Sequence, residues 1–399
     1  MGVAFMDLKR QYETLKDELE SAALEVLRSG AYIGGKHVIA FENSMKSFLG
    51  TKHAVACSNG TDALMMALQA LGVNPGDEVI TTPFTFFATA ESISSVGATP
   101  VFADINEGDF NINPAEIERK ISPRTKAIMP VHIFGTPCDM DTINAIARKH
   151  GLKVVEDAAQ AIGSRYKGRM IGAAADIGSF SFYPTKNLGG FGDGGMVTTD
   201  DDDLATILLA LREHGAAKNG AKARALLHGV RDEHAGSMGS STDALYNPYK
   251  YFNYITGYNS RLDALQAALL GVKLRYLEGF NASRARIAAR YNEGLKDFVI
   301  VPTHDPQVTC CYHQYAIRTP RKEEMGKFLA NKGIGTGAFY PVPLHLQKAY
   351  DDLGYREGSL PVAEKIAGQT VCLPIFPELT DREVEEVIIA VQEFVRNSA

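Results

Sequence analysis

The chain has 399 residues, of which 45% are hydrophobic and 22% are charged, and its formal net charge is −6. A chain of this length can bury a large core without disulfides and is long enough for two or three domains. The acidic balance argues against a nucleic-acid binder, which would carry a basic face, and no apolar run approaches the roughly 20 residues that span a bilayer.

The cysteine pattern indicates a reduced protein without a bound metal. None of the five cysteines forms a CxxC pair, and their spacings suit neither zinc nor iron–sulfur ligation. An odd, scattered set is typical of a reducing compartment, and the charged opening stretch lacks the apolar core of a signal peptide. We therefore expect a cytoplasmic protein. The cysteines are Cys57, Cys138, Cys310, Cys311 and Cys372.

The first predicted element is an amphipathic helix over residues 7–29, outside the pattern that follows. From there to residue 200, strand-like runs alternate with helix-like stretches such as residues 61–72. Several runs are apolar nearly throughout, as strands covered on both faces must be, so the alternation indicates an α/β fold with a mostly parallel sheet between helices. The predicted strands cover residues 53–58, 78–84, 99–105, 126–134, 152–158, 177–183 and 195–200.

The character of the sequence changes after residue 215. Residues 215–258 are rich in Gly, Ser, Asn and Tyr and favour a long irregular segment, a kind of loop that is often functional. A helix is predicted over residues 260–280, followed by further helices and shorter strands. We therefore predict a large domain over residues 1–258 and a smaller α+β domain over residues 259–399, with the amino-terminal helix packing on the smaller domain.

Ligands of open α/β sheets bind at the carboxyl ends of the strands, so the residues that follow each strand are candidates for a site. The first predicted strand runs directly into "SNGTDA", where a helix begins. Free amides at a helix amino terminus attract phosphate, and a glycine lets the anion approach closely, which makes Gly60 and Thr61 candidates. A simple helix cap by Asn59 or Thr61 is the commoner explanation of this motif taken alone.

An aromatic cluster and an acidic pair follow two further strands. Phe84, Phe86 and Phe87 crowd a turn, where an aromatic can stack on a flat ring, although core filling is the better explanation for the cluster alone. Glu156 and Asp157 end another strand, and because adjacent residues point to opposite faces, only one of them can enter a site. Such a carboxylate can hold a protonated ring nitrogen or cap the next helix, and the sequence leaves both open.

The stretch "SFYPTKNLGGFGDGG" contains a single lysine, Lys186, just past a predicted strand. A free lysine has a pKa near ~10.4 and is a poor nucleophile at neutral pH, but as a Schiff base with an aldehyde it carries an electrophile, and once released it can move protons. Gly190, Gly192 and Gly195 match G-x-G-x-x-G. Because another strand-like run follows where a dinucleotide site needs a helix, we reject a nicotinamide site here.

Together these features meet the needs of one cofactor. A helix terminus for phosphate, an aromatic side chain for a ring, an acid for a ring nitrogen and a lysine for an aldehyde are the groups that pyridoxal phosphate requires. The sequence also resembles a known family, the DegT/StrS-type nucleotide-sugar aminotransferases, over nearly its whole length. The matching stretches include "SNGTDAL", "GDEVITTPFTFFATA", "VVEDAAQAIG", "SFYPTKNLGGFGDGG", "GYNSRLDALQAA" and "PVPLHLQ".

The resemblance implies a pyridoxal-phosphate-dependent transferase of the aspartate-aminotransferase fold (fold type I). It implies a mostly parallel, seven-stranded sheet in the large domain and a smaller α+β carboxy-terminal domain. Lys186 would form the Schiff base and carry protons, and Asp157 would pair with the pyridine nitrogen. Asn259 would reach the phosphate from a neighbouring subunit, so that the active site needs a homodimer.

The resemblance also implies roles for other residues near the cofactor and the substrate. The implied phosphate contacts are Gly60, Thr61 and Ser181, the implied ring contacts are Phe86 and Gln160, and the implied substrate-side residues are Tyr32, Tyr183, Tyr340 and His345. Each of the last four has an alternative explanation as a packed aromatic or a buried histidine.

The implied reaction is a transamination in which L-glutamate gives its amino group to the cofactor. The pyridoxamine form then aminates a keto group of a nucleoside-diphosphate keto-deoxyhexose. The opening stretch and "PLHLQKAY" look more like the members that aminate C-3, so we expect a 3-keto sugar, with C-4 amination or a keto-cyclitol acceptor as alternatives. Dehydratase relatives carry histidine where this chain has Lys186, which favours transamination.

The rival hypothesis is a protein that uses this fold only for binding or regulation. Such a protein has no evident need for the Schiff-base lysine, so the intact set of cofactor residues argues against it. The sequence leaves the nucleotide and the sugar open. It also leaves open whether residues 215–258 form a lid, a dimer arm or a wall of the substrate pocket.

Overall fold

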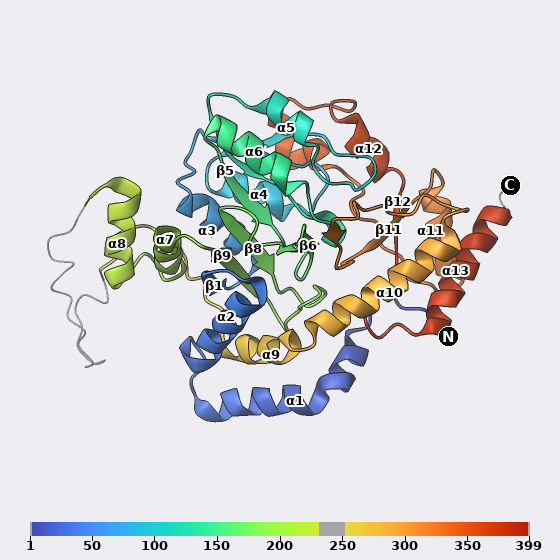
Figure 1. The fold of residues 1–399 in the computed structure, drawn as a ribbon, viewed down its shortest axis with the longest axis horizontal. Coiled ribbons are helices and arrows are strands. Elements are labelled where there is room, and N and C mark those ends of the chain that lie inside the picture. Colours follow the sequence, from blue (N-terminus) through green and yellow to red (C-terminus); the bar gives the residue numbers. More distant parts are fainter. Residues whose placement is uncertain (1, 231–251, 398–399) are drawn as a thin grey trace.

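The computed structural model of the chain describes residues 2–230 and 252–397 (Figure 1). The strands of its central sheet are β1 (His53–Cys57), β2 (Glu78–Thr81), β3 (Thr99–Phe102), β4 (Thr125–Met129), β5 (Lys153–Asp157), β8 (Ile177–Ser181) and β9 (Gly195–Thr199). They lie in the order β1-β9-β8-β5-β4-β2-β3. β9 is antiparallel to both neighbours and the other pairs are parallel, so the predicted seven-stranded, mostly parallel sheet is confirmed.

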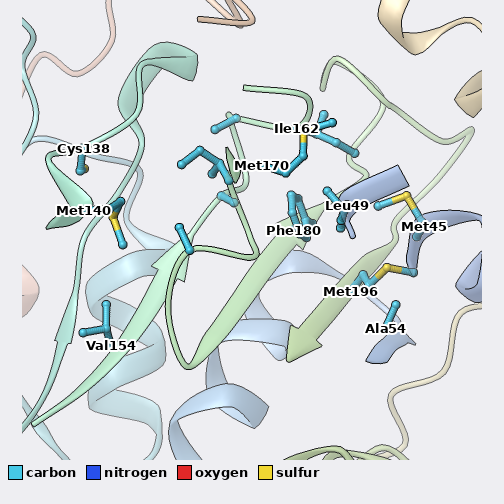
Figure 2. Close-up of a cluster of buried hydrophobic side chains, with 14 of the residues drawn as sticks. Met45, Leu49, Ala54, Cys138, Met140, Val154, Ile162, Met170, Phe180 and Met196 are labelled. Carbon is cyan, nitrogen blue, oxygen red and sulfur yellow. The ribbon is translucent and has the colours of Figure 1, made fainter. Parts of the chain in front are cut away.

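Helices cover both faces of this sheet. One face is covered by α2 (Gly35–Leu49), α6 (Met140–His150) and α9 (Ala264–Leu274), and the other by α3 (Gly60–Ala70), α4 (Ala88–Ser95) and α7 (Asp202–Arg212). Because alternate strand residues point to opposite sides, Val154 packs in the first layer and Val155 in the second. Figure 2 shows part of the first layer, including Val154. The sheet is therefore buried on both faces, and only its ends are open to a ligand.

The amino-terminal helix, α1 (Leu8–Ser29), lies outside the sheet, as the sequence predicts. Leu15 packs with apolar side chains of α9, and Figure 1 shows the two helices side by side. The beginning of α1 reaches α13 (Asp381–Arg396), where Arg10 donates to both carboxylate oxygens of Glu383, at 2.8 and 2.6 Å. The helix thereby ties the two ends of the chain together.

The carboxy-terminal region is built on an antiparallel strand pair. Its main elements are α10 (Leu277–Leu295), β11 (Tyr315–Arg318), α11 (Lys322–Asn331), β12 (Thr370–Leu373) and α13. The three helices cover the pair with a second apolar core. The shorter elements of the chain are α5 (Pro114–Lys120), β6 (Arg165–Tyr166), β7 (Arg169–Met170), β10 (Val308–Thr309) and α12 (Pro361–Ala367).

Two local predictions are wrong. Part of the segment predicted to be irregular forms α8 (Ala217–His228), because Ala, Lys, Arg and Leu, which favour helices, outweigh its single glycine and asparagine. The remainder of that segment, from 231 to 251, lies outside the described residues. The helix predicted over residues 260–280 is broken between α9 and α10 at Arg275 and Tyr276, whose side chains both bind Glu18 of α1.

None of the helices within residues 2–230 and 252–397 combines the length and the apolar character that a membrane span needs.

Candidate active site

A cavity of about 530 Å³ opens where the carboxyl ends of the parallel strands meet. Its wall is made by residues at the ends of β1, β2, β4, β5 and β8 and by two segments from the carboxy-terminal region. Ends of parallel strands converge on one edge of a sheet, so residues far apart in sequence come together there. The predicted site residues that line the cavity are Gly60, Thr61, Phe86, Asp157, Gln160, Ser181, Tyr183, Lys186 and Tyr340.

Of the acidic pair at the end of β5, Asp157 enters the cavity and Glu156 does not. Glu156 is fully buried on the opposite face, where it accepts from the amides of Gly172 (3.0 Å) and Ala174 (2.7 Å). The Nε2 atom of His132 lies 3.1 Å from the same carboxylate. Glu156 therefore holds the loop that follows β7, and Asp157 is left for chemistry.

The Asp157 carboxylate is buried at the base of the cavity and is held at both oxygens. The hydroxyl of Thr89 donates to Oδ2 at 2.8 Å, and the amide of Ala159 donates to Oδ1 at 3.2 Å. Burial raises the pKa of Asp157, while these two hydrogen bonds and the charge of Lys186 lower it. A buried carboxylate with both oxygens hydrogen-bonded suits a cationic N–H group as a partner, because a nearby positive charge offsets the cost of burying the negative one.

Lys186 lies in the loop after β8, where its amide donates to the carbonyl of Tyr183 at 2.8 Å. Burial lowers the pKa of Lys186 to about 8, against the opposing charges of Asp157 and Cys311. Within the described residues, no carboxylate forms an ion pair with its ammonium. A much larger fraction of this amine is neutral near pH 7 to 8 than for a solvated lysine, and the neutral amine is the nucleophile.

The amino terminus of α3 forms a cradle beside Ser181. The side chain of Asn59 caps the helix by accepting from the amide of Asp62 at 2.8 Å, so the cap that the sequence suggested is present. Helix geometry leaves the amides of Gly60 and Thr61 without partners in the helix, and both residues line the cavity. A Cβ atom at Gly60 would lie 2.7 Å from Cβ of Ser181, so glycine is needed for this close approach.

Aromatic and amide side chains form the rest of the wall. Phe86 is 60% exposed and lines the cavity, whereas Phe84 is fully buried in the core. The ring centroid of Phe86 lies 6.4 Å from that of Tyr340. Gln160 donates to the hydroxyl of Tyr340 at 2.9 Å and accepts from the amide of Phe134 at 2.8 Å, which fixes its amide group in one orientation.

Three predicted residues do not line the cavity of this chain. Tyr32 is half exposed and donates to the carbonyl of Leu27 at 3.2 Å. Asn259 is exposed. His345 is buried, and its Nε2 lies 2.9 Å from Oε1 of Glu364. This arrangement matches the alternative explanation of a buried, hydrogen-bonded histidine.

Sequence reasoning missed Thr85, Thr89 and His313, which also line the cavity. Thr85 lies in the bend before α4 and Thr89 in its first turn, and no local pattern in the sequence indicates that the two hydroxyls meet. His313 lies 3.1 Å from Asn187, from Nδ1 to Oδ1, and burial lowers its pKa well below the usual value. No signal near His313 in the sequence indicates that it meets the loop that carries Lys186.

No group of residues in the described part of the chain could hold a metal ion. The five cysteines are all free and buried.

A family model described as the DegT/DnrJ/EryC1/StrS aminotransferase family matches residues 13–392. The chain belongs to this family. It is 44% identical to a pleiotropic regulatory protein of Geobacillus stearothermophilus, with 100% of both chains covered. It is 41% identical to dTDP-3-amino-3,4,6-trideoxy-alpha-D-glucose transaminase of Streptomyces venezuelae, with 98% of this chain and 96% of that protein covered. A crystal structure of S. venezuelae DesV in complex with a ketimine intermediate matches with a TM-score of 0.89 and 41% identity, covering 99% of this chain and 98% of that one.

Members of the DegT/DnrJ/EryC1/StrS family are transaminases that use pyridoxal phosphate, and solved members hold the cofactor in its pyridoxal or pyridoxamine form. The chain is therefore a pyridoxal-phosphate-dependent transaminase of the predicted fold. The donor set of the cavity fits this cofactor. It offers an amine with a lowered pKa, a buried acid, an open aromatic face and a helix terminus with free amides.

Proposed function

We propose that this transaminase moves the amino group of L-glutamate to the C-3 keto group of a nucleoside-diphosphate keto-deoxyhexose. The observation that carries the proposal is the single cavity in which Lys186, Asp157 and the amino terminus of α3 meet. The relative from S. venezuelae is named for a dTDP-linked sugar with an amino group at position 3, which supports the acceptor class and the position. The cavity volume of about 530 Å³ lies in the range of small-molecule sites.

Different residues of the cavity bind different parts of the cofactor. The amides of Gly60 and Thr61 and the hydroxyl of Ser181 bind the phosphate, because free amides at a helix terminus favour an anion. Asp157 accepts the hydrogen bond of the protonated ring nitrogen, and Phe86 covers one ring face. When bound, pyridoxal phosphate supplies the electron sink for the bond that breaks at the donor carbon.

Lys186 provides the amine that bonds the cofactor aldehyde and later moves the proton. With its pKa lowered to about 8, the amine of Lys186 would be able both to take up a proton from the donor carbon and to give it up again near neutral pH. Tyr340 accepts a hydrogen bond from Gln160, which leaves the phenolic proton of Tyr340 available to a group in the cavity.

We further propose that a homodimer completes the active site. Asn259 and Tyr32 are exposed in the single chain and lie outside its cavity. Both side chains are therefore accessible to a second copy, in which Asn259 would reach the phosphate of the neighbouring site. A polar contact from a partner chain of this kind would make the cofactor site depend on dimer formation.

The proposed function is tested with the two half-reactions of the holoprotein. Glutamate should bleach the visible absorbance and release 2-oxoglutarate, and a 3-keto nucleotide sugar should then restore the absorbance. If a 4-keto sugar or a keto-inositol restores the absorbance instead, that compound is the acceptor and the proposed 3-keto sugar is wrong. A visible band that glutamate leaves unchanged would contradict the proposed donor, and a protein that acts only in regulation would show neither half-reaction.

A further inference from the structure

The Asp157 carboxylate lies at the end of a buried chain of two hydroxyl groups. Oγ1 of Thr89 lies 2.8 Å from Oδ2 of Asp157, and Oγ1 of Thr85 lies 3.2 Å from Oγ1 of Thr89. The exposed fractions of Thr85, Thr89 and Asp157 are 2%, 1% and 4%. Neither threonine is needed to hold the phosphate or the aldehyde, so their common position beside the acid calls for a separate explanation.

The direction of the two hydrogen bonds follows from the number of protons. A carboxylate ion only accepts, so the one hydroxyl proton of Thr89 is donated to Asp157. The proton between the two threonines must then come from Thr85. Thr85, Thr89 and Asp157 all line the cavity, and the donation from Thr85 to Thr89 polarises the donation from Thr89 to the acid.

Thr89 makes the stronger of the two contacts to Asp157. Its distance of 2.8 Å is shorter than the 3.2 Å between Oδ1 and the amide of Ala159. Burial raises the pKa of Asp157, and the hydrogen bond from Thr89 is the largest of the effects that lower it. Loss of this one hydroxyl would therefore leave a buried carboxylate oxygen without a partner and make the carboxylate a stronger base.

The backbone gives Thr89 a fixed place relative to the aromatic wall of the cavity. Thr89 lies in the first turn of α4, and its amide donates to the carbonyl of Phe86 at 3.2 Å. A β-branched side chain in a helix has few rotamers, so the hydroxyl is held in position before the cofactor binds. One turn of chain thus presents Phe86 to the cavity and Thr89 to the acid.

We propose that Thr89 is a positioning residue of the transaminase, whose hydroxyl orients Asp157 and keeps it ionised so that the proton stays on the ring nitrogen of pyridoxal phosphate. The inference rests on the proposed pairing of Asp157 with that nitrogen. Without the hydroxyl, Asp157 takes a larger share of the proton. The amino-group transfer then slows, because a neutral ring withdraws electrons less strongly.

The test uses holoenzyme reconstituted with cofactor that carries nitrogen-15 in the ring. The nitrogen chemical shift, followed against pH, distinguishes a protonated ring nitrogen from a neutral one. In Thr89→Val, which keeps the shape and removes the hydroxyl, we expect the proton of the pair to move from the ring nitrogen toward Asp157, with the ratio of the two forms changing by about 10- to 100-fold. The nitrogen chemical shift on the plateau of the titration should then lie nearer to that of the neutral ring than in the wild type. In Thr89→Ser, which restores the hydroxyl, we expect the titration to return toward the wild-type position.

Thr81→Val is the matched control. Thr81 is also fully buried, but its hydroxyl donates to the backbone carbonyl of Met129 at 2.8 Å rather than to a carboxylate. We expect this variant to lose stability without moving the nitrogen titration. A general effect of removing a buried hydroxyl would move the titrations of both variants, whereas the proposed role moves only that of Thr89→Val.

The outcomes separate this inference from the proposed function. Asp157→Asn should itself shift the ring nitrogen toward the neutral form, and its failure to do so would overturn the pairing on which both rest. A normal response to Asp157→Asn with an unchanged titration in Thr89→Val would overturn the role of Thr89 alone. Should Thr89→Val fail to fold, Thr85→Val provides the test. Loss of the Thr85 hydroxyl should change the ring-nitrogen chemical shift in the same direction by a smaller amount. An unchanged chemical shift in Thr85→Val would contradict the proposed role of the two hydroxyls.

Discussion

Asp157 and Lys186 face one cavity from the ends of two paired strands, and the charge of each shifts the pKa of the other. β5 and β8 run in parallel, and Lys186 lies in the loop that follows β8. Burial raises the pKa of Asp157 and lowers that of Lys186 to about 8, while the attraction between the two charges opposes both shifts. An acid and an amine perturbed in this way are typical of a site that moves protons.

The first prediction concerns the pH dependence of cofactor capture. Only the neutral amine attacks an aldehyde, so with a pKa of about 8 at Lys186, capture of pyridoxal phosphate by the apoprotein should accelerate up to pH 8 and level off above it. A solvated lysine would keep accelerating to about pH 10. Stopped-flow measurement of the visible band checks this, with Lys186→Ala as the blank. A rate that still rises steeply above pH 9 would contradict the lowered pKa.

Two neighbouring phenylalanines should respond in opposite ways to truncation. Phe84→Ala removes a fully buried ring and should lower the free energy of unfolding by about 3–5 kcal/mol. Phe86→Ala removes an exposed ring, so the free energy of unfolding of the apoprotein should change by less than about 0.5 kcal/mol. Its affinity for pyridoxal phosphate should fall by about 2- to 10-fold, because a ring contact is lost. Urea unfolding and cofactor titration measure the two effects, and equal stability losses would contradict the assignment.

Gly60→Ala should close the phosphate cradle. The added methyl would lie 2.7 Å from Cβ of Ser181, so α3 would have to move away from β8. We expect the affinity for pyridoxal phosphate to fall by about 10- to 100-fold. Gly279→Ala, in an exposed part of α10 with nothing within 4 Å of the added carbon, is the control and should bind normally. An unchanged dissociation constant in Gly60→Ala would argue against a phosphate at this helix terminus.

Mixed dimers test the shared active site. If Asn259 acts across the interface, Lys186→Ala and Asn259→Ala homodimers should both be inactive. A heterodimer of the two chains should regain about half of the wild-type activity, because one of its two sites holds both native residues. Co-expression with two affinity tags isolates this species. A heterodimer as inactive as its parents would show that both residues serve the same chain's site.

The sheet was predictable from sequence because its strands are covered on both faces, which leaves continuous apolar runs such as residues 127–131. Gly60, Asp157 and Lys186 were predictable for a related reason. Each lies at the end of a strand or in the loop that follows one, and the ends of parallel strands meet at one edge whatever the order of the strands.

The remaining contacts depend on the order of the strands, which local pattern does not encode. Thr89 meets Asp157 because β4 alone lies between β2 and β5 in the sheet. Strict alternation indicated that Glu156 and Asp157 point to opposite sides, but which of the two lines the cavity became clear only from the structure. His313 comes from the carboxy-terminal region, so no residue spacing near Lys186 indicates that it lines the same cavity.

The most direct test of the account is borohydride reduction of the holoprotein followed by peptide mapping. Lys273 is the natural competitor, because burial also lowers its pKa to about 8, yet it bonds the carbonyl of Gly189 and does not line the cavity. The account predicts a pyridoxyl group on Lys186. A label on Lys273 or another lysine, or no label at all, would contradict it.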